Sequence, residues 1–388
     1  MDSDAVKKPK TDRTLKISFI GSGAVNFGGA EGPWDHSKRL EQLGGVEFVA
    51  IVDPLVEKAR DVLEKKMAGA YAHLYTNCKV LTDYRELLSM GDNKPDAAFI
   101  GIPPFCHGSY NNDIELQLVK AGVHVFVEKP ISVQPPEEVQ PYVEELSRIA
   151  KEQGLIVSVA YMFRYHDAIN KMKEIITEHG RPLMTIKVSY NCAYAELDHS
   201  FWWDVKKSGG PIVEQATHLC DLVRYLGGEV DTSQLTGLAI PASDEPSEVG
   251  YLSTVPAVVN EQKVPVNDRI PRLTTAQWKF TNGTVGTLTH GVTLLCQRYE
   301  ANIDIWADGL RIALEEPYYP ECRLRVRRGY TDEEQVYRFP NADPYYKEDE
   351  AFLTAVRTGD SSFIKSSYED AYKTYSLTWA VRQASTTH

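Results

Sequence analysis

The 388-residue sequence lacks the features that mark several common protein classes. Its six cysteines include no C-x-x-C pair, so neither a disulfide framework nor a zinc or other metal site is expected. No run approaches the ~18 uninterrupted apolar residues that would span a membrane. The polar start, MDSDAVKKPKTDRTLK, also lacks the apolar core of a secretory signal. We therefore expect a cytoplasmic protein with reduced thiols and no membrane partner.

Positive charge is also scarce. Lysine and arginine total 42 against 54 aspartates and glutamates, which gives a formal net charge of -12. Binding to nucleic acid requires a concentrated basic surface that this balance disfavours. We expect no nucleic-acid partner and a small molecule as the ligand.

The length exceeds what one hydrophobic core usually supports, so two domains are expected after a short tail. In the first part, apolar strand patterns such as LKISFIG, VEFVAIVD and VHVFVEKP alternate with helical patterns such as PPEEVQPYVEELSRIAKEQG. This alternation predicts a doubly wound parallel sheet. We assign residues 1–13 to a disordered tail, 14–160 to a Rossmann domain and 161–388 to a second domain.

The second half has a different pattern. Strand-like runs are joined by Asn282-Gly283 and Asp308-Gly309, dipeptides typical of tight hairpin turns. They predict an α+β domain with a large, mostly antiparallel sheet. Between about Asp231 and Arg272 the chain loses clear periodicity, which indicates a long connection. A final helical segment is expected from Lys347 to Gln383.

A glycine-rich turn follows the first expected strand. Gly21 and Gly23 open a G-x-G-x-x-G pattern, but Asn26 occupies its third position and the stretch from Gly28 to Arg39 is unusually long. Asp53 ends the next strand, where a carboxylate can bind ribose hydroxyls while the turn holds pyrophosphate at a helix N-terminus. A tight turn without a ligand is the alternative. The residues predicted to bind a dinucleotide here are Gly21, Ser22, Gly23, Ala24 and Asp53.

Two later strands end in residues that point to the same edge of the sheet. One ends in IPPFCH and the other in EKP. Ligands of doubly wound folds bind at the carboxyl ends of the strands. Taken alone, a plain proline loop is an equally good interpretation of the first. Charges at the end of a buried strand are usually solvated, but two that face the same crevice as the glycine turn favour a functional site. The candidate cofactor contacts at this edge are Ile102, Pro103, Pro104, His107, Glu128 and Lys129.

The segment SGGPIVEQATHLCDLVRYLGG predicts a helix with glycines before and after it. Glu214, His218, Asp221 and Tyr225 share one face at helical spacing. A histidine and a carboxylate so placed form either a structural ion pair or part of a proton-transfer site.

The ordered set of motifs resembles the Gfo/Idh/MocA family of sugar and polyol oxidoreductases. The glycine turn, IPP..H, EKP and GGPIVEQATHLCDLVRYLGG occur in the family's order, and YMFRYH and Y..E...F..AV..G extend the resemblance over nearly the whole chain. The resemblance implies NAD or NADP as cofactor and a homodimer or homotetramer formed through the antiparallel sheet. It also implies that Lys129 and His218 are catalytic, and that Glu214 stands where many members carry Asp.

Aromatic residues and one arginine lie near segments that the resemblance places at the substrate. Tyr165 and Trp202 lie in the same segments. Aromatic residues in such segments are equally often part of an ordinary hydrophobic core. The predicted substrate-binding residues are Tyr161, Arg164, Tyr194, Trp203, Glu214 and His218.

For the cofactor, the sequence favours NAD over NADP. Asp53 would repel a 2′-phosphate, and no Arg or Lys follows it directly, although Lys38 and Arg39 lie in the long segment. The expected activity is hydride transfer between the nicotinamide and a secondary alcohol of a sugar, polyol or carbohydrate derivative. Two alternatives stay open: a glycoside-cleaving enzyme that uses transient oxidation, and a cofactor-binding regulator of the same fold.

Overall fold

The computed structural model describes residues 13–29, 32–195, 197, 199–256, 259–296 and 298–386. The expected disordered tail lies outside these residues, apart from Arg13. The chain forms two compact units, each described by itself. Unit 1 contains the described residues up to Ile131, Val139–Ala160 and Tyr345–Glu369. Unit 2 contains Ser132–Glu138, Tyr161–Pro344 and the described residues from Asp370 onward.

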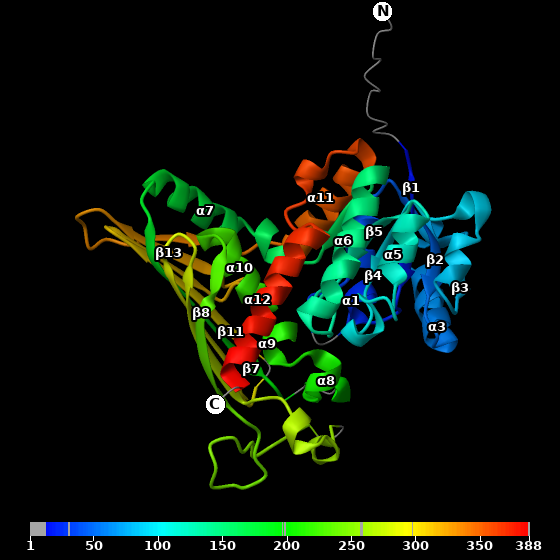
Figure 1. Ribbon diagram of the computed structural model, residues 1–388. Helices are drawn as coiled ribbons and strands as arrows, with labels where there is room; N and C mark the ends of the chain where they lie inside the picture. The colour runs from blue at the N-terminus through cyan, green and yellow to red at the C-terminus, as the bar shows by residue number, and fades with distance from the viewer. Residues whose placement is uncertain are drawn as a thin grey trace, which may run out of the picture. The chain divides into compact units, whose positions relative to one another are not determined.

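Unit 1 is built on a six-stranded parallel sheet in the order β3-β2-β1-β4-β5-β6 (Figure 1). Its strands are β1 (Leu15–Ile20), β2 (Val46–Val52), β3 (Lys79–Leu81), β4 (Ala97–Ile100), β5 (His124–Val127) and β6 (Val157–Val159). The central strands are almost continuously buried because a doubly wound sheet is covered on both faces. The predicted Rossmann fold is confirmed.

The helices of unit 1 connect these strands. They are α1 (Ala24–Phe27), α2 (His36–Leu43), α3 (Val56–Met67), α4 (Arg85–Leu88), α5 (Ile114–Lys120), most of α6 (Pro136–Gln153) and α11 (Pro344–Thr358). The helix expected after the glycine turn is interrupted. A single turn, α1, forms at once, and helical structure resumes only at His36.

Helix α11 belongs to unit 1. The sequence left two placements open for the final helical segment, within the second domain or packed back from it. Residues Phe352, Leu353 and Ala355 of α11 are buried in the core cluster that also contains Phe99 and Phe126 of the parallel sheet. A helix with such an apolar face packs where it finds matching apolar surface, which sequence order alone does not reveal.

Unit 2 contains an eight-stranded sheet in the order β14-β13-β12-β11-β7-β10-β9-β8. Its strands are β7 (Leu183–Ala193), β8 (Val230–Ile240), β9 (Leu273–Phe280), β10 (Val285–Leu294), β11 (Glu300–Ala307), β12 (Leu310–Glu315), β13 (Arg323–Arg328) and β14 (Gln335–Arg338). Only β7 and β10 pair in parallel. Gly283 and Gly309 have φ values of 90° and 71° in the turns that join β9 to β10 and β11 to β12. The predicted antiparallel sheet and both hairpins are confirmed.

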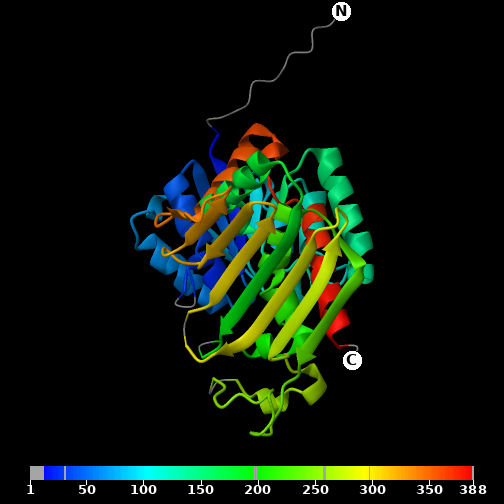
Figure 2. The same cartoon turned by 90° about the vertical axis from the view of Figure 1, so that its left-hand side faces the viewer.

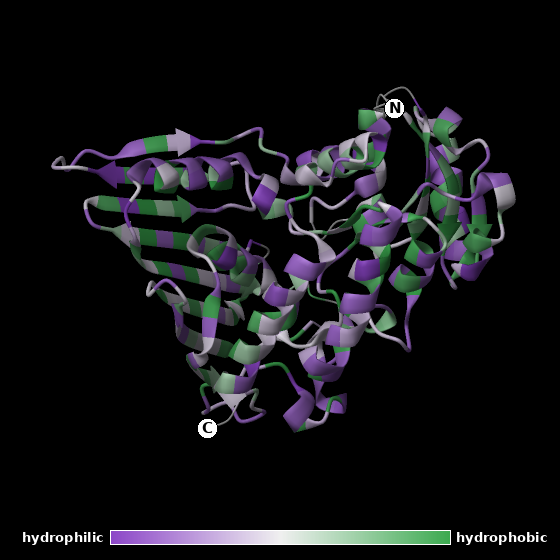
Figure 3. Cartoon of the chain, turned by 45° about the horizontal axis from the view of Figure 1, so that its top comes forward, coloured by the Kyte–Doolittle hydropathy of each residue, from purple (hydrophilic) through white to green (hydrophobic). Residues whose placement is uncertain are grey.

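The two faces of this sheet differ. Along β11, Ala301, Ile303 and Ile305 are buried, while Asp304 and Trp306 alternate with them on the other face. Figure 3 shows the resulting bands of apolar and polar residues across the strands. Figure 2 looks onto the face that carries no helices. The helices of unit 2 are α7 (Asp167–His179), α8 (Val205–Ser208), α9 (Pro211–Glu214), α10 (Thr217–Gly227) and most of α12 (Tyr368–Thr386).

Two sequence expectations in the C-terminal half need correction. The connection expected from Asp231 begins as strand β8, because residues 230–231 and 236–240 pair with β9. The expected final helix consists of α11 and α12, which are separated around Gly359. None of the described helices is long and apolar enough to cross a membrane.

Candidate functional site

The glycine turn in unit 1 combines one crowded glycine with one open glycine. At Gly21, φ is +95°, and a built Cβ would lie 2.4 Å from the carbonyl oxygen of Gly101. The ends of β1 and β4 therefore approach so closely that only glycine fits. At Gly23, a built Cβ would meet no atom within 4 Å. The backbone at Gly23 is thus open to close approach by a ligand.

Asn26 compensates structurally for the missing third glycine. Its Nδ2 donates to the carbonyl oxygens of Gly21 at 2.8 Å and Ile20 at 3.2 Å, and the residue is fully buried. A Cβ on Gly101 would lie 2.9 Å from Nδ2 of Asn26, so Gly101 provides the space that the asparagine occupies. The Asn26 amide therefore holds the turn. The close contact between Asn26 and a glycine backbone occurs at Gly101, directly after β4.

Asp53 lies directly beside this turn, as the sequence predicted. Its Oδ2 accepts hydrogen bonds from the backbone nitrogen of Ser22 at 2.8 Å and from Ser22 Oγ at 2.6 Å. Its Oδ1 accepts one from the backbone nitrogen of Leu55 at 2.8 Å. Burial alone would raise the pKa of Asp53, but these hydrogen bonds hold it below its ordinary value. Asp53 is thus ionised at neutral pH and fixed against the turn.

The strand ends also bring Ile102 to the turn, because a Cβ on Gly21 would lie 2.8 Å from Ile102 Cγ2. Pro103 is exposed and Pro104 is buried. His107 is 2% exposed, and its Nδ1 lies 2.7 Å from Glu115 Oε1. This buried pairing favours a role in holding the loop after β4 over the cofactor contact that the sequence predicted.

Glu128 and Lys129 follow β5 at the same edge. The backbone nitrogen of Glu128 donates to the carbonyl oxygen of Ile100 at 2.9 Å, which ties this segment to the end of β4. Glu128 Oε1 lies 3.1 Å from Nε2 of His36, the first residue of α2. Both Glu128 and Lys129 are half-buried.

In unit 2, the continuous helix predicted through Glu214 and His218 is wrong. α9 ends at Glu214, and α10 begins at Thr217. The backbone nitrogen of Ala216 donates to the carbonyl oxygen of Pro211 at 2.9 Å, a spacing of five residues instead of four. Wide turns of this kind occur frequently at functional sites. Glu214 and His218 are half-buried on either side of the break.

Glu214 is oriented by an indole. Trp202 Nε1 donates to Glu214 Oε2 at 2.9 Å. Trp202 lies in a short 3₁₀ helix, Ser200–Trp203, which precedes α8. One carboxylate oxygen is therefore held in place from within unit 2.

Gln215 anchors the break itself to the large sheet. Its Oε1 lies 3.0 Å from His290 Nε2 on β10, and its Nε2 donates to Cys192 Sγ on β7 at 3.3 Å. Burial lowers the pKa of His290 to about 3, so this imidazole is neutral and donates to the amide oxygen. His290 also stacks on Tyr190, with ring centroids 5.2 Å apart. Gln215, which lies between Glu214 and His218, is thus fixed from two strands.

Aromatic rings surround His218. The ring centroids of Tyr161, Phe163 and Tyr318 lie 6.1, 5.7 and 6.5 Å from that of His218. Tyr161 is 1% exposed, and its hydroxyl lies 2.8 Å from Thr217 Oγ1. The structure therefore places Tyr161 beside His218, as a packing partner.

Arg164 is placed differently from the sequence prediction. Its Nε and one terminal nitrogen contact Asp221 at 2.8 and 2.6 Å, and the same terminal nitrogen lies 2.6 Å from Asp370. Thr374 also donates to Asp221 at 2.9 Å. The Arg164 side chain is only 5% exposed. A guanidinium buried between two carboxylates stabilises unit 2, so we do not carry Arg164 forward as a substrate contact.

Two predicted aromatic contacts are also buried. Trp203 is fully buried, and its Nε1 donates to the carbonyl oxygen of Leu197 at 2.9 Å. Tyr194 is 3% exposed and packs on Trp203 with ring centroids 6.5 Å apart. Both belong to the core of unit 2, the alternative that burial statistics had left open.

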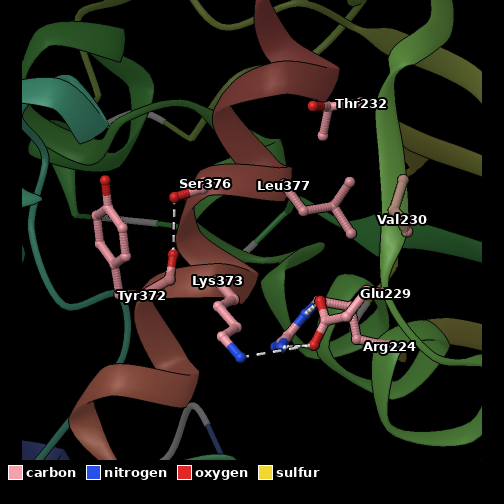
Figure 4. A pocket seen from close by; sticks show the side chains of 8 residues that line it. All are labelled: Arg224, Glu229, Val230, Thr232, Tyr372, Lys373, Ser376 and Leu377. Atoms are coloured by element: carbon pink, nitrogen blue, oxygen red, sulfur yellow. Dashed lines mark hydrogen bonds and ion pairs between the residues drawn. The ribbon is translucent and has the colours of Figure 1, made fainter. Parts of the chain in front are cut away.

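A cavity of about 200 Å³ lies elsewhere in unit 2 (Figure 4). Its lining comes from the end of α10, from β8 and from α12 and includes Arg224, Glu229 and Lys373. Arg224 donates to Glu229 and Thr374, and Lys373 lies 4.0 Å from Glu229. No sequence-predicted site residue lines this cavity, and its charges are paired. Across the described residues, no three His, Cys, Asp or Glu side chains form a potential metal site.

Sequence reasoning missed His36, Asp349, Gln215 and His290. His36 contacts the predicted site residue Glu128, and Asp349 contacts His36. Gln215 lies between Glu214 and His218 and contacts His290 on β10. The unusual length of the segment before His36 was the one available signal. Gln215 lies inside a predicted motif, but its role depends on the helix break.

Comparisons with known proteins agree with this architecture. The family described as "Oxidoreductase family, NAD-binding Rossmann fold" matches residues 15–161, and an oxidoreductase C-terminal domain family matches residues 164–310. Uncharacterized protein UNK4.17 of Schizosaccharomyces pombe is 40% identical, over 96% of this chain and 92% of that protein. The myo-inositol 2-dehydrogenase of Thermotoga maritima is 21% identical, over 95% of this chain and 96% of that enzyme.

Among solved structures, KijD10, a 3-ketoreductase from Actinomadura kijaniata in complex with NADP and TDP-benzene, has the same fold. Its TM-score is 0.72 at 17% identity, covering 96% of this chain and 98% of that chain. Together with the family match across the Rossmann unit, these similarities show that the chain belongs to the Gfo/Idh/MocA family and is an NAD(P)-binding oxidoreductase.

Proposed function

We propose that this enzyme transfers hydride between NAD and a secondary alcohol of a sugar or cyclic polyol. The observation that carries the proposal is the strand-end edge of unit 1, where the open backbone of Gly23 adjoins the fixed carboxylate of Asp53. The substrate class follows from the relatives, which include a myo-inositol 2-dehydrogenase and a 3-ketoreductase.

The residues present fit a dinucleotide. Gly21, Ser22, Gly23 and Ala24 form a turn with free space over Gly23, where a pyrophosphate can approach the backbone. Asp53 accepts three hydrogen bonds from the protein, and a carboxylate offers about four acceptor positions. One position is therefore left for a ribose hydroxyl.

The structure supports NAD over NADP in two ways. The Asp53 carboxylate is held ionised and would repel a 2′-phosphate. Arg39, a potential partner for that phosphate, donates to the carbonyl oxygens of Pro33 at 2.8 Å and Asp35 at 3.2 Å. Lys38 remains exposed. Direct titration with NADH and NADPH tests this preference, and tighter binding of NADPH would overturn it.

In the proposed reaction, Lys129 and His218 handle the proton. His218 accepts the substrate hydroxyl proton, since an imidazole exchanges protons near neutral pH. The Lys129 ammonium stabilises the negative charge that develops on the substrate. Glu214 accepts a hydrogen bond from a second substrate hydroxyl, and Trp202 fixes its direction. When bound, the nicotinamide ring supplies the hydride acceptor or donor.

The proposal is tested by screening sugars, cyclic polyols, sugar acids and aryl glycosides for nicotinamide reduction with each cofactor. Lys129→Ala and His218→Ala should each lower turnover roughly 10²–10⁴-fold while cofactor affinity stays near wild type. Glu214→Gln should give a smaller loss. Wild-type turnover in both alanine variants would refute these roles, and aryl glycoside cleavage would favour the glycosidase alternative.

The two glycines of the turn provide a matched test of cofactor binding. Gly23→Ala should leave the free-enzyme stability within about 0.5 kcal/mol, because its Cβ meets nothing, while weakening NADH binding. Gly21→Ala should destabilise unit 1 itself, because its Cβ would collide with the Gly101 backbone. Unchanged NADH affinity in Gly23→Ala would place the pyrophosphate elsewhere.

We also propose a homodimer or homotetramer in the cytoplasm, as the family resemblance implies. The face of the large sheet opposite its buried side supports this assembly, because Trp306 on β11 is 42% exposed there. Light scattering on the purified enzyme distinguishes these states from a monomer.

A further inference from the structure

The long segment that follows the glycine turn ends by bringing a histidine to Glu128, the residue before Lys129. We propose that His36 is a positioning residue whose imidazolium fixes the Glu128 carboxylate, in the residue directly before Lys129. The inference rests on the proposed function in one respect, which is the participation of Lys129 in the reaction. Its structural content lies entirely within unit 1.

Both ring nitrogens of His36 face carboxylates. Nδ1 lies 2.8 Å from Asp349 Oδ1 on α11, and Nε2 lies 3.1 Å from Glu128 Oε1 at the end of β5. Ionised carboxylates are acceptors only, so both ring nitrogens donate and the ring is an imidazolium. The side chains of His36, Asp349 and Glu128 are 3%, 0% and 13% exposed. Solvent therefore screens these charges little.

The positive charge of His36 depends on the two carboxylates, because its other surroundings disfavour a cation. Burial by itself lowers the pKa of His36, but Asp349 and Glu128 together raise it to about 10. The imidazole packs on apolar rings: the ring centroids of Phe99 and Phe126 lie 5.4 and 5.0 Å from that of His36. His36 also begins α2, and the positive end of a helix dipole disfavours a cation.

The other charged groups around His36 support the same charge state. Arg39, on the same helix, acts favourably on Asp349, and burial raises the pKa of Asp349 while the imidazolium opposes that rise. Burial and the nearby charge of Glu128 both raise the pKa of Tyr345, at the start of α11. The His36 imidazolium is thus the positive charge in contact with both carboxylates.

The end of the long segment is built to hold His36 in place. Asp35 caps α2 by accepting from the backbone nitrogen of Lys38 at 2.9 Å and from Ser37 Oγ at 2.7 Å. Arg39 ties the segment together through the carbonyl of Pro33 and lies 4.9 Å from the Tyr345 ring centroid. Cap and arginine together fix the first turn of α2, so the imidazole direction is set before any ligand binds.

The consequence for Glu128 follows from its contacts. In the wild-type chain, Glu128 and Asp349 share one imidazolium. Replacing His36 by a neutral residue removes that shared positive charge, and the Glu128 carboxylate, directly before Lys129 in the chain, loses its contact with the imidazolium. Conversely, removing the Glu128 charge takes away one of the two carboxylates that favour the charged ring.

The test measures the titration of His36 directly, without a substrate. Histidines are labelled with ¹³C, and the His36 resonance is assigned by its loss in His36→Gln. In Glu128→Gln, the midpoint of the His36 titration should fall by about one pH unit, because one of its two carboxylate partners is lost. Glu57→Gln, at an exposed position of α3 in unit 1, is the matched control and should change nothing.

An unchanged His36 midpoint in folded Glu128→Gln would overturn the proposal. A second arm needs no variant of the cluster. In ¹³C-histidine-labelled wild-type enzyme, one imidazole should remain protonated well above pH 8, and titration of every histidine below pH 7 would also overturn the proposal. Loss of turnover in Lys129→Ala bears on the proposed function alone, so the two ideas fail separately.

Discussion

Two buried histidines, one in each unit, are in opposite charge states. His36 in unit 1 is 3% exposed and His290 in unit 2 is 1% exposed. The pKa of His36 is raised to about 10, whereas that of His290 is lowered to about 3. Equal burial therefore leads to opposite outcomes.

The difference comes from the hydrogen-bonding partners. His36 contacts two carboxylates, which favour the charged ring and outweigh the cost of burial. His290 contacts the Gln215 amide oxygen and stacks on Tyr190, and neither supplies a full negative charge. Unit 1 thus holds a buried cation between two carboxylates, and unit 2 uses a neutral donor to fix the backbone between Glu214 and His218.

The largest expected effect comes from removing one partner of the charged histidine. Asp349→Asn leaves His36 without its 2.8 Å contact and should lower the free energy of unfolding by about 3 kcal/mol, the usual cost of breaking a buried pair. Calorimetry checks this value. Asp61→Asn, at an exposed position of α3, is the control and should cost only a few tenths of a kcal/mol. Equal effects of the two substitutions would contradict the buried ion pair.

The two histidines should also give opposite pH dependences of stability. The folded state holds the His36 proton between pH 6.5 and about 10, so this contribution is complete below pH 6.5 and is lost as pH rises through about 10. For His290, the unfolded state binds the proton between pH 6.5 and about 3, so stability is lost as pH falls through that range.

Urea unfolding across pH separates these two contributions. His36→Gln should flatten the alkaline loss, and His290→Gln should flatten the acid loss, each by up to about 1.4 kcal/mol per pH unit. If the two variants changed the same limb of the profile, the assignment of opposite charge states would be wrong.

Local sequence patterns predicted the elements of both regions but not their long-range partners. Strand runs and the turn at Asn282-Gly283 depend on neighbouring residues, and the structure confirms them. Arg164 has the residue type of a sugar-binding side chain, but Asp370, more than 200 positions away, helps to bury it. His36 depends on Glu128 and Asp349 in the same way.

The break between α9 and α10 was hidden for a different reason. The apolar spacing across Glu214 and His218 fits a continuous helix, and the register changes only through the five-residue hydrogen bond from Ala216 to Pro211. The side-chain contacts of Gln215 with two strands accompany that change. Tertiary contacts therefore override a local helical preference at this point.

A single substitution should make the neutral histidine resemble the charged one. Gln215→Glu gives His290 a carboxylate at the position of the amide, which should raise the His290 pKa by roughly one unit or more. Histidine NMR titration checks the change. Gln277→Glu, exposed on β9, is the matched control and should leave His290 unaltered. No shift in Gln215→Glu would mean that burial, and not the partner, decides the charge state.

The smallest expected effect tests the other hydrogen bond of Gln215. Burial raises the pKa of Cys192 to about 12, so the thiol stays protonated, and its sulfur is a weak acceptor for Gln215 Nε2 at 3.3 Å. Cys192→Ala should lower the free energy of unfolding by only about 1 kcal/mol, mostly through lost packing. The His290 titration should not move, because the sulfur does not contact the imidazole in this network. A large shift of that titration would show that the thiol orients the amide, and the neutral state of His290 would then depend on all three side chains together.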